Sequence, residues 1–197
     1  MGFFLLFIIM DSLRKKIQEI IKEIYLKEFT DEEYETISSQ YSNKRIILSN
    51  ENEIDFYSRD DHQKITYKPK GLWYGFGNSW LEWVRSEMPD WEKYYKSIFL
   101  LEINESSVLK LSSKEELIEF TKKYSPSHNS IDPSSISYFE RNMIDWSMVA
   151  NNYAGIEINP YIYSARMDRF TNWYYPWDVA SGCIWRKSGI KSITKII

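Results

Sequence analysis

Two tryptophan-rich segments constrain the fold of this chain more than any other feature of its sequence. The first covers residues 68–75, KPKGLWYG, and the second covers residues 173–185, WYYPWDVASGCIW. Each combines large aromatic rings with glycine and other small residues in a run that is typical of a strand. Such runs predict either an aromatic core or a wall on which a flat ligand stacks, and both interpretations stay open here.

Length and charge limit the classes of protein to which the chain can belong. A chain of 197 residues forms one domain, with or without an added helix. Its formal net charge of −3 excludes a global attraction to nucleic acid or anionic lipid. The charge is uneven, however, because residues 166–197 contain six basic and two acidic side chains. That end either faces a phosphate group or forms a solvated surface.

The cysteine and histidine content gives no sign of a metal centre or a disulfide. Cys183 is the single cysteine, so an internal disulfide is impossible and a reducing compartment is expected. Together with His62 and His128 it cannot form a structural zinc cluster. The sequence therefore predicts no metal cofactor.

The first ten residues are strongly apolar but resemble neither a membrane span nor a signal peptide. The run MGFFLLFIIM is too short to cross a bilayer, and it lacks a basic region and a small-residue cleavage site. Residues 1–9 are either a non-native start before Met10 or a hydrophobic tail. We expect a cytoplasmic protein, in the host cytoplasm if the source is viral.

Residues 1–42 are predicted to form a helical appendage. Within residues 11–29, apolar side chains recur at helical spacing and Lys and Glu fill the other face, which indicates an amphipathic helix. The apolar positions are Leu13, Ile17, Ile20, Ile21 and Ile24. Residues 31–41 are expected to form a second, short helix.

Residues 43–197 are predicted to form an α+β domain of two small, mostly antiparallel sheets with flanking helices. Many short strand-like runs alternate with a few helical ones, an order typical of that class. The expected strands are residues 45–48, 53–59, 64–67, 71–75, 97–103, 108–111, 155–158, 182–185 and 191–197. The expected helices are residues 80–88, which Pro89 ends, a helix capped by Ser112 or Ser113 that runs to Tyr124, and residues 145–150. Residues 125–137 are predicted to be a loop or a lid.

Standard catalytic motifs are absent from the sequence. It contains no dinucleotide-binding glycine fingerprint, P-loop, nucleophile elbow or zinc-protease motif. Gly75-Phe76-Gly77 is an isolated glycine pair, which serves either as a turn before the helix that follows or as a phosphate cradle.

The order of these elements resembles the ADP-ribosyltransferase-like fold, including its toxin and RES-type branches. Arg59 or His62 on an early strand, Trp73-Tyr74 on a glycine-rich strand before a helix, and the closing run 190–193 correspond to that family's three motifs. The resemblance covers roughly residues 45–197 and rests on element order more than on identities. The tryptophan-rich segments also resemble an uncharacterised protein group of large DNA viruses, phages and bacteria.

The resemblance implies NAD as the substrate, with transfer of ADP-ribose or hydrolysis of NAD. Tyr57 and Arg59 would orient phosphate or ribose, and Tyr74, with Trp73 beside it, would stack on nicotinamide. Asp178 and Ser181 would hold the ribose as the catalytic pair. The chain departs from the family at one position: the family's catalytic Glu corresponds to about Ser181 here, and serine carries no charge. The family's chemistry needs negative charge near the developing positive ribose carbon.

Other carboxylates and other functions remain open from the sequence. Asp178, Glu157 and Glu140 are the acidic side chains that could replace the missing Glu. Alternatively, the aromatic groove binds a nucleotide-like small molecule or a protein target without chemistry, or the chain is a viral structural or interaction protein. Trp73 and Tyr74 occupy alternate faces of one strand, so at most one faces a ligand site. Trp177 and Trp185 are expected in the core. The sequence does not indicate the oligomeric state.

Overall fold

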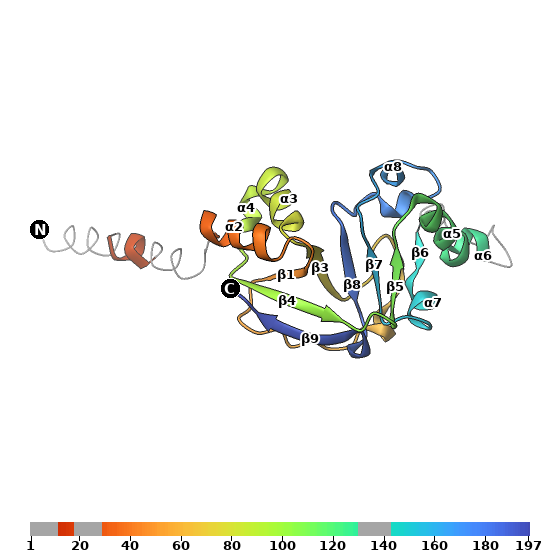
Figure 1. The fold of residues 1–197 in the computed structure, drawn as a ribbon, viewed down its shortest axis with the longest axis horizontal. Helices are drawn as coiled ribbons and strands as arrows, with labels where there is room; N and C mark the ends of the chain where they lie inside the picture. Colours follow the sequence, from red (N-terminus) through yellow and green to blue (C-terminus); the bar gives the residue numbers. More distant parts are fainter. Residues whose placement is uncertain (1–11, 18–28, 130–142) are drawn as a thin grey trace, which may run out of the picture.

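The computed structural model describes residues 12–17, 29–129 and 143–197, and in this part of the chain the protein is an α+β fold built on one large sheet (Figure 1). The sheet has seven strands in the order β5-β7-β8-β3-β1-β4-β9. Neighbouring strands are antiparallel except for β5 and β7, which are parallel. In that order, the strands are Val108–Leu111, Gly155–Ile158, Ser181–Ile184, Leu72–Phe76, Arg45–Ser49, Ser97–Ile103 and Ile190–Lys195.

The expected pair of small sheets is only partly correct. A second sheet exists, but it has two short strands, β2 (Ile65–Thr66) and β6 (Ile144–Asp145). The large sheet is continuous because the two tryptophan-rich segments pair directly with each other. Trp73 lies opposite Cys183 and Tyr74 lies opposite Gly182 in the β3–β8 ladder. This ladder joins strands that would otherwise form separate sheets.

Residues 53–59 do not form the expected strand. They have no ladder partner, although Ile54 and Phe56 still point inward and pack against the sheet. Their alternating pattern therefore reflects burial of every second side chain without strand pairing. A short 3-10 helix, η1 (Asp60–His62), follows them.

The helices begin where local capping chemistry favours them. Helix α2 (Asp31–Gln40) has a capping box between Thr30 and Glu33. The Ser113 side chain caps α5 (Lys114–Tyr124) by accepting a hydrogen bond from the Glu116 backbone N–H. Pro89 ends α3 (Ser79–Glu87) as expected, but it also begins α4 (Pro89–Glu92), because a proline at the first helical position sacrifices no hydrogen bond. The remaining short helices are α6 (Pro126–Asn129), α7 (Trp146–Ala150), α8 (Tyr163–Arg166), η4 (Asn172–Tyr174) and η5 (Lys187–Gly189).

The sheet curls, and each of its faces carries a separate part of the core. The inner face holds one apolar cluster in which Val108 of the edge strand β5 joins Ile103 of β4, from the far side of the sheet. The outer face carries two clusters. One lies under α5 and α7 and contains Trp146, Trp173, Trp177 and Trp185, and the other lies under α2 and α3. Trp177 and Trp185 are fully buried, which confirms that prediction.

The predicted N-terminal appendage is described only in part. Residues 12–17 are helical, and Leu13 and Ile17 are about half exposed. Residues 1–9, the other apolar positions of the amphipathic helix, and most of the loop expected at 125–137 lie outside the described residues. Among the residues that are described, no helix is long and apolar enough to cross a membrane.

The close approach of β3 to β8 predicts that Gly182 cannot carry a side chain. A Cβ atom at this position would lie 2.3 Å from the Tyr74 hydroxyl oxygen and 2.7 Å from the backbone oxygen of Ile156. We expect Gly182→Ala to lower the free energy of unfolding by about 2 kcal/mol or more, measured by urea denaturation. A urea denaturation curve that coincides with that of the unsubstituted protein would contradict this close packing.

Candidate functional site

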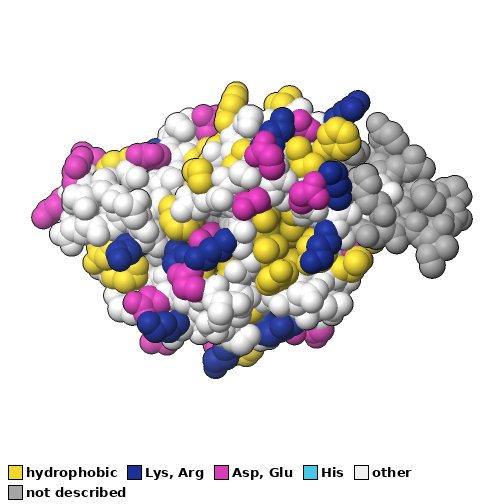
Figure 2. Space-filling view, turned by 45° about the vertical axis from the view of Figure 1, so that its right-hand side comes forward, with side chains coloured by type: hydrophobic (Ala, Val, Ile, Leu, Met, Phe, Trp, Pro, Cys, Tyr) yellow, Lys and Arg dark blue, Asp and Glu magenta, His cyan; other side chains and the backbone are white. Residues whose placement is uncertain are grey.

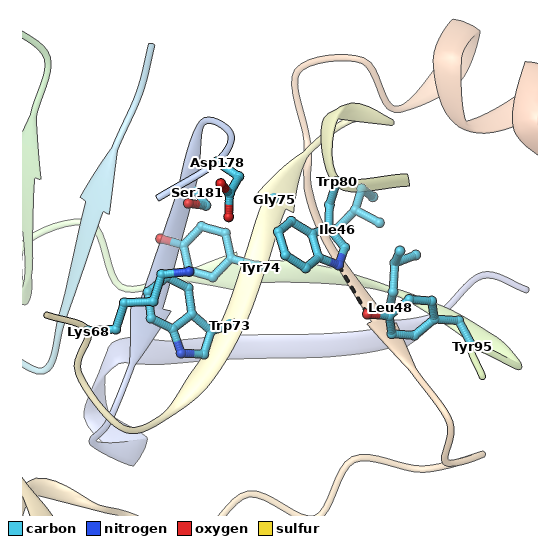
Figure 3. Close-up of a pocket in the computed structure, with 10 residues that line it drawn as sticks. All are labelled: Ile46, Leu48, Lys68, Trp73, Tyr74, Gly75, Trp80, Tyr95, Asp178 and Ser181. Carbon is cyan, nitrogen blue, oxygen red and sulfur yellow. Dashed lines mark hydrogen bonds between the residues drawn. The ribbon is translucent and has the colours of Figure 1, made fainter. Parts of the chain in front are cut away.

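A cavity of about 310 Å³ lies on the outer face of the sheet, and Figure 3 shows the side chains that line it. It crosses β1, β3 and β8 at the centre of the sheet. The lining residues are Ile46, Leu48, Lys68, Trp73, Tyr74, Gly75, Trp80, Tyr95, Asp178 and Ser181. Both tryptophan-rich segments therefore contribute to it.

The alternation of strand β3 decides which of its side chains face the cavity. Trp73 packs with the outer-face cluster, whereas Tyr74 belongs to the inner-face cluster. Gly75 again lies on the outer side, where an added Cβ would approach the Trp80 Cβ to 3.1 Å. The absence of a side chain at Gly75 lets helix α3 bring the Trp80 indole against the sheet.

Aromatic rings form the two ends of the apolar wall. At one end, Trp73 meets Trp177 edge to face, with the ring centroids 4.9 Å apart. At the other end, Trp80 stacks on Trp83, with centroids 5.0 Å apart, and its Nε1 donates a hydrogen bond of 3.3 Å to the Tyr95 hydroxyl (Figure 3). These contacts hold both indoles in place, so the wall is preformed.

Charged and hydroxyl groups gather at the Trp73 end. The Lys68 ammonium lies 5.0 Å from the centre of a Trp73 ring, a cation–π contact. Asp178 accepts a hydrogen bond of 3.3 Å from Arg166 Nη2. The Ser181 hydroxyl donates to the Val179 backbone oxygen at 2.9 Å.

Burial shifts the pKa of both charged groups toward their neutral forms. Burial raises the pKa of Asp178, and the positive charges of Lys68 and Arg166 oppose that rise only in part. Burial likewise lowers the pKa of Lys68, against the opposing effect of Asp178. An acid and an amine with pKa values displaced toward each other, beside a cavity, are typical of a functional site.

The structure brings the side chains of three of the six expected site residues, Trp73, Asp178 and Ser181, to this cavity. Tyr74 lies in the cavity floor, but its ring belongs to the inner-face cluster and its hydroxyl donates to Glu157, so the expected stacking of Tyr74 on nicotinamide is not what the structure shows. Tyr57 and Arg59 are not among the lining residues. Tyr57 is 67% exposed and donates a hydrogen bond to Asp55, while the exposed Arg59 is fixed through its backbone. The alternative first-motif residue, His62, is also exposed and pairs with Asp61.

Sequence reasoning assigned no site role to several lining residues. Lys68 belongs to the first tryptophan-rich segment, where a second lysine follows two residues later. Nothing in this local sequence indicated that Lys68 would be half-buried. Trp80 was expected on one face of its helix, but nothing indicated which strand that face would meet. Ile46 and Leu48 reach the cavity because β1 lies beside β3, and Tyr95, which precedes β4, meets the cavity at Trp80.

Glu157, one of the carboxylates considered for catalysis, lies on the other side of the sheet. Its neighbours Ile156 and Ile158 face the outer cluster, so Glu157 faces inward, where it is 5% exposed. Arg45 binds both of its carboxylate oxygens, with Nε at 2.5 Å and Nη2 at 3.0 Å. The Tyr74 hydroxyl donates a third hydrogen bond at 2.9 Å. We call these three side chains the inner-face triad.

The electrostatics of the inner-face triad are those of a structural unit. Burial by itself lowers the pKa of Arg45, but the hydrogen bonds and charge of Glu157 outweigh it and hold that pKa above its ordinary value. Burial and the charge of Glu157 raise the pKa of Tyr74 well above its ordinary value. Arg45 also pairs with the exposed Glu105, at 3.0 Å. Among the described residues that line the cavity, Asp178 is the carboxylate. Glu140 lies outside them.

Within the described ranges, no group of three His, Cys, Asp or Glu side chains is placed to hold a metal ion. No protein-family model, curated protein or solved structure matches the chain significantly. The resemblance to the ADP-ribosyltransferase-like fold, and to the group from viruses, phages and bacteria, stays a prediction.

Breaking the inner-face triad is expected to destabilise the fold strongly. Arg45→Met leaves the Glu157 carboxylate buried without its cation, which costs about 3–5 kcal/mol of unfolding free energy. The double variant Arg45→Met/Glu157→Leu is expected to recover part of this loss, because no buried charge remains. Urea denaturation of both variants measures the difference. A loss below about 1 kcal/mol in Arg45→Met would show that the triad contributes little.

The raised pKa of Asp178 predicts a pH-dependent stability. The folded state binds a proton at Asp178 more tightly than the unfolded chain does, so this contribution is full below the ordinary pKa of 3.8 and is lost as the pH rises through the folded value. Relative to Asp178→Asn, the unsubstituted protein should therefore lose stability as the pH rises from about 3.8 through the folded value. Thermal melts across that range measure the difference, with the surface variant Asp90→Asn as control. A difference that grows in the opposite direction would refute the assigned shift.

Proposed function

We propose that the protein binds a compact, flat, nucleotide-like ligand in the cavity on the outer face of the sheet. The observation that carries this proposal is the arrangement of Trp73 and Trp80 around one space with Lys68 and Asp178 at its end. Indole faces stack on flat rings, and a few convergent polar groups orient the bound molecule.

The size of the cavity narrows the class of ligand. Its volume of about 310 Å³ is at the lower end of the range for small-molecule sites, which is roughly 300–1,000 Å³. A base or a nicotinamide ring with part of its sugar suits this space, whereas a whole dinucleotide would extend beyond it. NAD is therefore expected to bind through one of its two halves.

Charged and hydroxyl groups at the Trp73 end of the cavity can bind the polar groups of one half of NAD. Lys68 supplies a cation for a phosphate or carbonyl oxygen, and the desolvation that lowers its pKa also strengthens its electrostatic contacts. Asp178 can accept a hydrogen bond from a ribose hydroxyl or an amide when it is ionised. Ser181 adds a hydroxyl group beside them.

Transfer of ADP-ribose, or hydrolysis of NAD, is the second candidate function. The half-buried carboxylate of Asp178 on the cavity wall favours it, because a carboxylate can stabilise positive charge that develops on a ribose carbon. Arg166 binds the same carboxylate and competes for its charge. Binding without turnover therefore needs fewer assumptions than catalysis does.

Ligand binding is expected to quench tryptophan fluorescence, because two indoles line the cavity. Nicotinamide mononucleotide, AMP and NAD are the ligands to titrate. Trp80→Leu should weaken the affinity by about tenfold, since stacking on one aromatic ring contributes roughly 1–3 kcal/mol. Trp91→Leu, which removes a partly exposed indole outside this cavity, is the matched control.

The same titrations separate the two candidate functions. Mass spectrometry of the recovered ligand shows whether NAD is intact, which indicates binding alone, or cleaved, which indicates turnover that Asp178→Asn should abolish. Equal losses in Trp80→Leu and Trp91→Leu, or no quenching by any of the three ligands, would refute the proposed site.

A further inference from the structure

An exposed surface of aromatic and basic side chains adjoins the polar end of the cavity. It is formed by α8 and the segment that follows, and we call it the α8 surface. Tyr163 and Met167 are 76% and 79% exposed, and Phe170 and Tyr175 are 46% and 50% exposed. These are four of the ten large hydrophobic side chains found exposed among the described residues, and they fall within thirteen consecutive positions. Such a concentration is typical of an interaction site.

Arginine side chains lie directly over the rings of this surface. The Arg166 guanidinium is 5.1 Å from the centre of the Tyr175 ring, and the Arg169 guanidinium is 4.8 Å from that of Phe170. Figure 2 shows one face of the molecule, on which hydrophobic side chains lie among Lys or Arg and Asp or Glu side chains. The α8 surface therefore presents positive charge and flat apolar rings side by side.

The local charge is opposite in sign to that of the whole chain. The α8 surface and its neighbours contain four cations, Lys68, Lys114, Arg166 and Arg169, against three anions, Glu87, Asp168 and Asp178. Lys114 pairs with Asp168 at 2.7 Å. The excess of one positive charge, on a chain whose formal net charge is −3, favours an anionic partner at this place.

The α8 surface is continuous with the cavity through a single ion pair. Arg166 contacts Tyr175 on the surface and Asp178 on the cavity wall. Lys68 and Asp178 both line the cavity, and the Lys68 ammonium lies over a Trp73 ring. Each of the two charged groups shifts the pKa of the other. A row of aromatic and charged groups therefore leads from the cavity onto the surface.

From this continuity we infer that the natural ligand is a single-stranded nucleic acid, with one base in the cavity and the adjoining backbone and bases along the α8 surface. The inference rests on the proposed function for the base in the cavity. Lys68, Arg166 and Arg169 would meet phosphate groups, and the rings of Tyr175, Phe170 and Tyr163 would stack on the following bases. Aromatic platforms combined with cations are the usual means of binding single strands without strong sequence preference.

The chemistry of the surface favours a strand over a protein partner. A strand repeats a flat ring and an anionic phosphate at each step, and the surface repeats an aromatic ring and a guanidinium in the same way. The cavity has room for one ring, which suits a base at the end of a strand or one turned away from its neighbours.

Fluorescence anisotropy with a labelled twelve-residue oligothymidylate tests the inference on the full chain. Arg169→Gln and Tyr163→Ser should each weaken binding by about five- to tenfold, and Arg169→Gln should lower the slope of log affinity against log salt by about 0.7. The matched controls lie at exposed sites outside the α8 surface: Lys191→Gln also removes one positive charge, and Tyr57→Ser removes the same phenol ring. Both controls should bind like the unsubstituted protein.

The outcomes separate this inference from the proposed function. Binding of free nicotinamide mononucleotide or AMP without binding of the oligonucleotide would overturn the inference and leave the proposed function intact. Oligonucleotide binding that responds to the α8 variants, in a protein that binds no free nucleotide, would support the α8 surface and remove the base from the cavity. Equal losses in variants and controls, or equal competition by inorganic polyphosphate, would show charge attraction alone and overturn the inference.

Discussion

The buried carboxylate of Glu157 is the constraint on which the rest of the structure depends. A carboxylate on the inner face of a curled sheet is tolerated only when cations and donors surround it. Arg45 provides the cation from β1, three strands away in the sheet, and Tyr74 provides the donor from β3. Tyr74 reaches Glu157 by crossing the strand between them, where Gly182 leaves room for the ring. The inner-face triad thus links β7, β3 and β1 across β8 and favours one register of these four neighbouring strands.

The position of the candidate site follows from the same register. With Tyr74 committed to the inner face, Trp73 faces outward, and the bare backbone at Gly75 admits Trp80 from α3. The residues around the cavity therefore come from parts of the chain that β1, β3 and β8 bring together. The sheet also keeps Glu157 away from the cavity and leaves Asp178 beside it. Any chemistry at the cavity has to use Asp178, whose negative charge Arg166 partly offsets.

One row of charged side chains connects the cavity to the α8 surface. Lys68, Asp178 and Arg166 alternate in sign, and each end of this row rests on an aromatic ring, Trp73 or Tyr175. Desolvation weakens the charge on Lys68 and Asp178 inside the cavity, while Arg169 remains exposed on the surface. The cavity therefore favours a flat ring with a polar or anionic group near Lys68, and the α8 surface favours an anion.

The sequence by itself determined what depends on near neighbours along the chain. The cap of α5 at Ser113, the strand at residues 97–103 and the burial of Trp177 and Trp185 follow from local patterns, and they confirm the α+β class. Tertiary structure alone decided which strands pair and what lies across the sheet. Residues 53–59 alternate like a strand but have no ladder partner, and Arg45 meets Glu157 across 112 positions of sequence. The convergence of Lys68, Trp80 and Asp178 has the same origin, because periodicity shows which side of a segment is buried but not the element against which it packs.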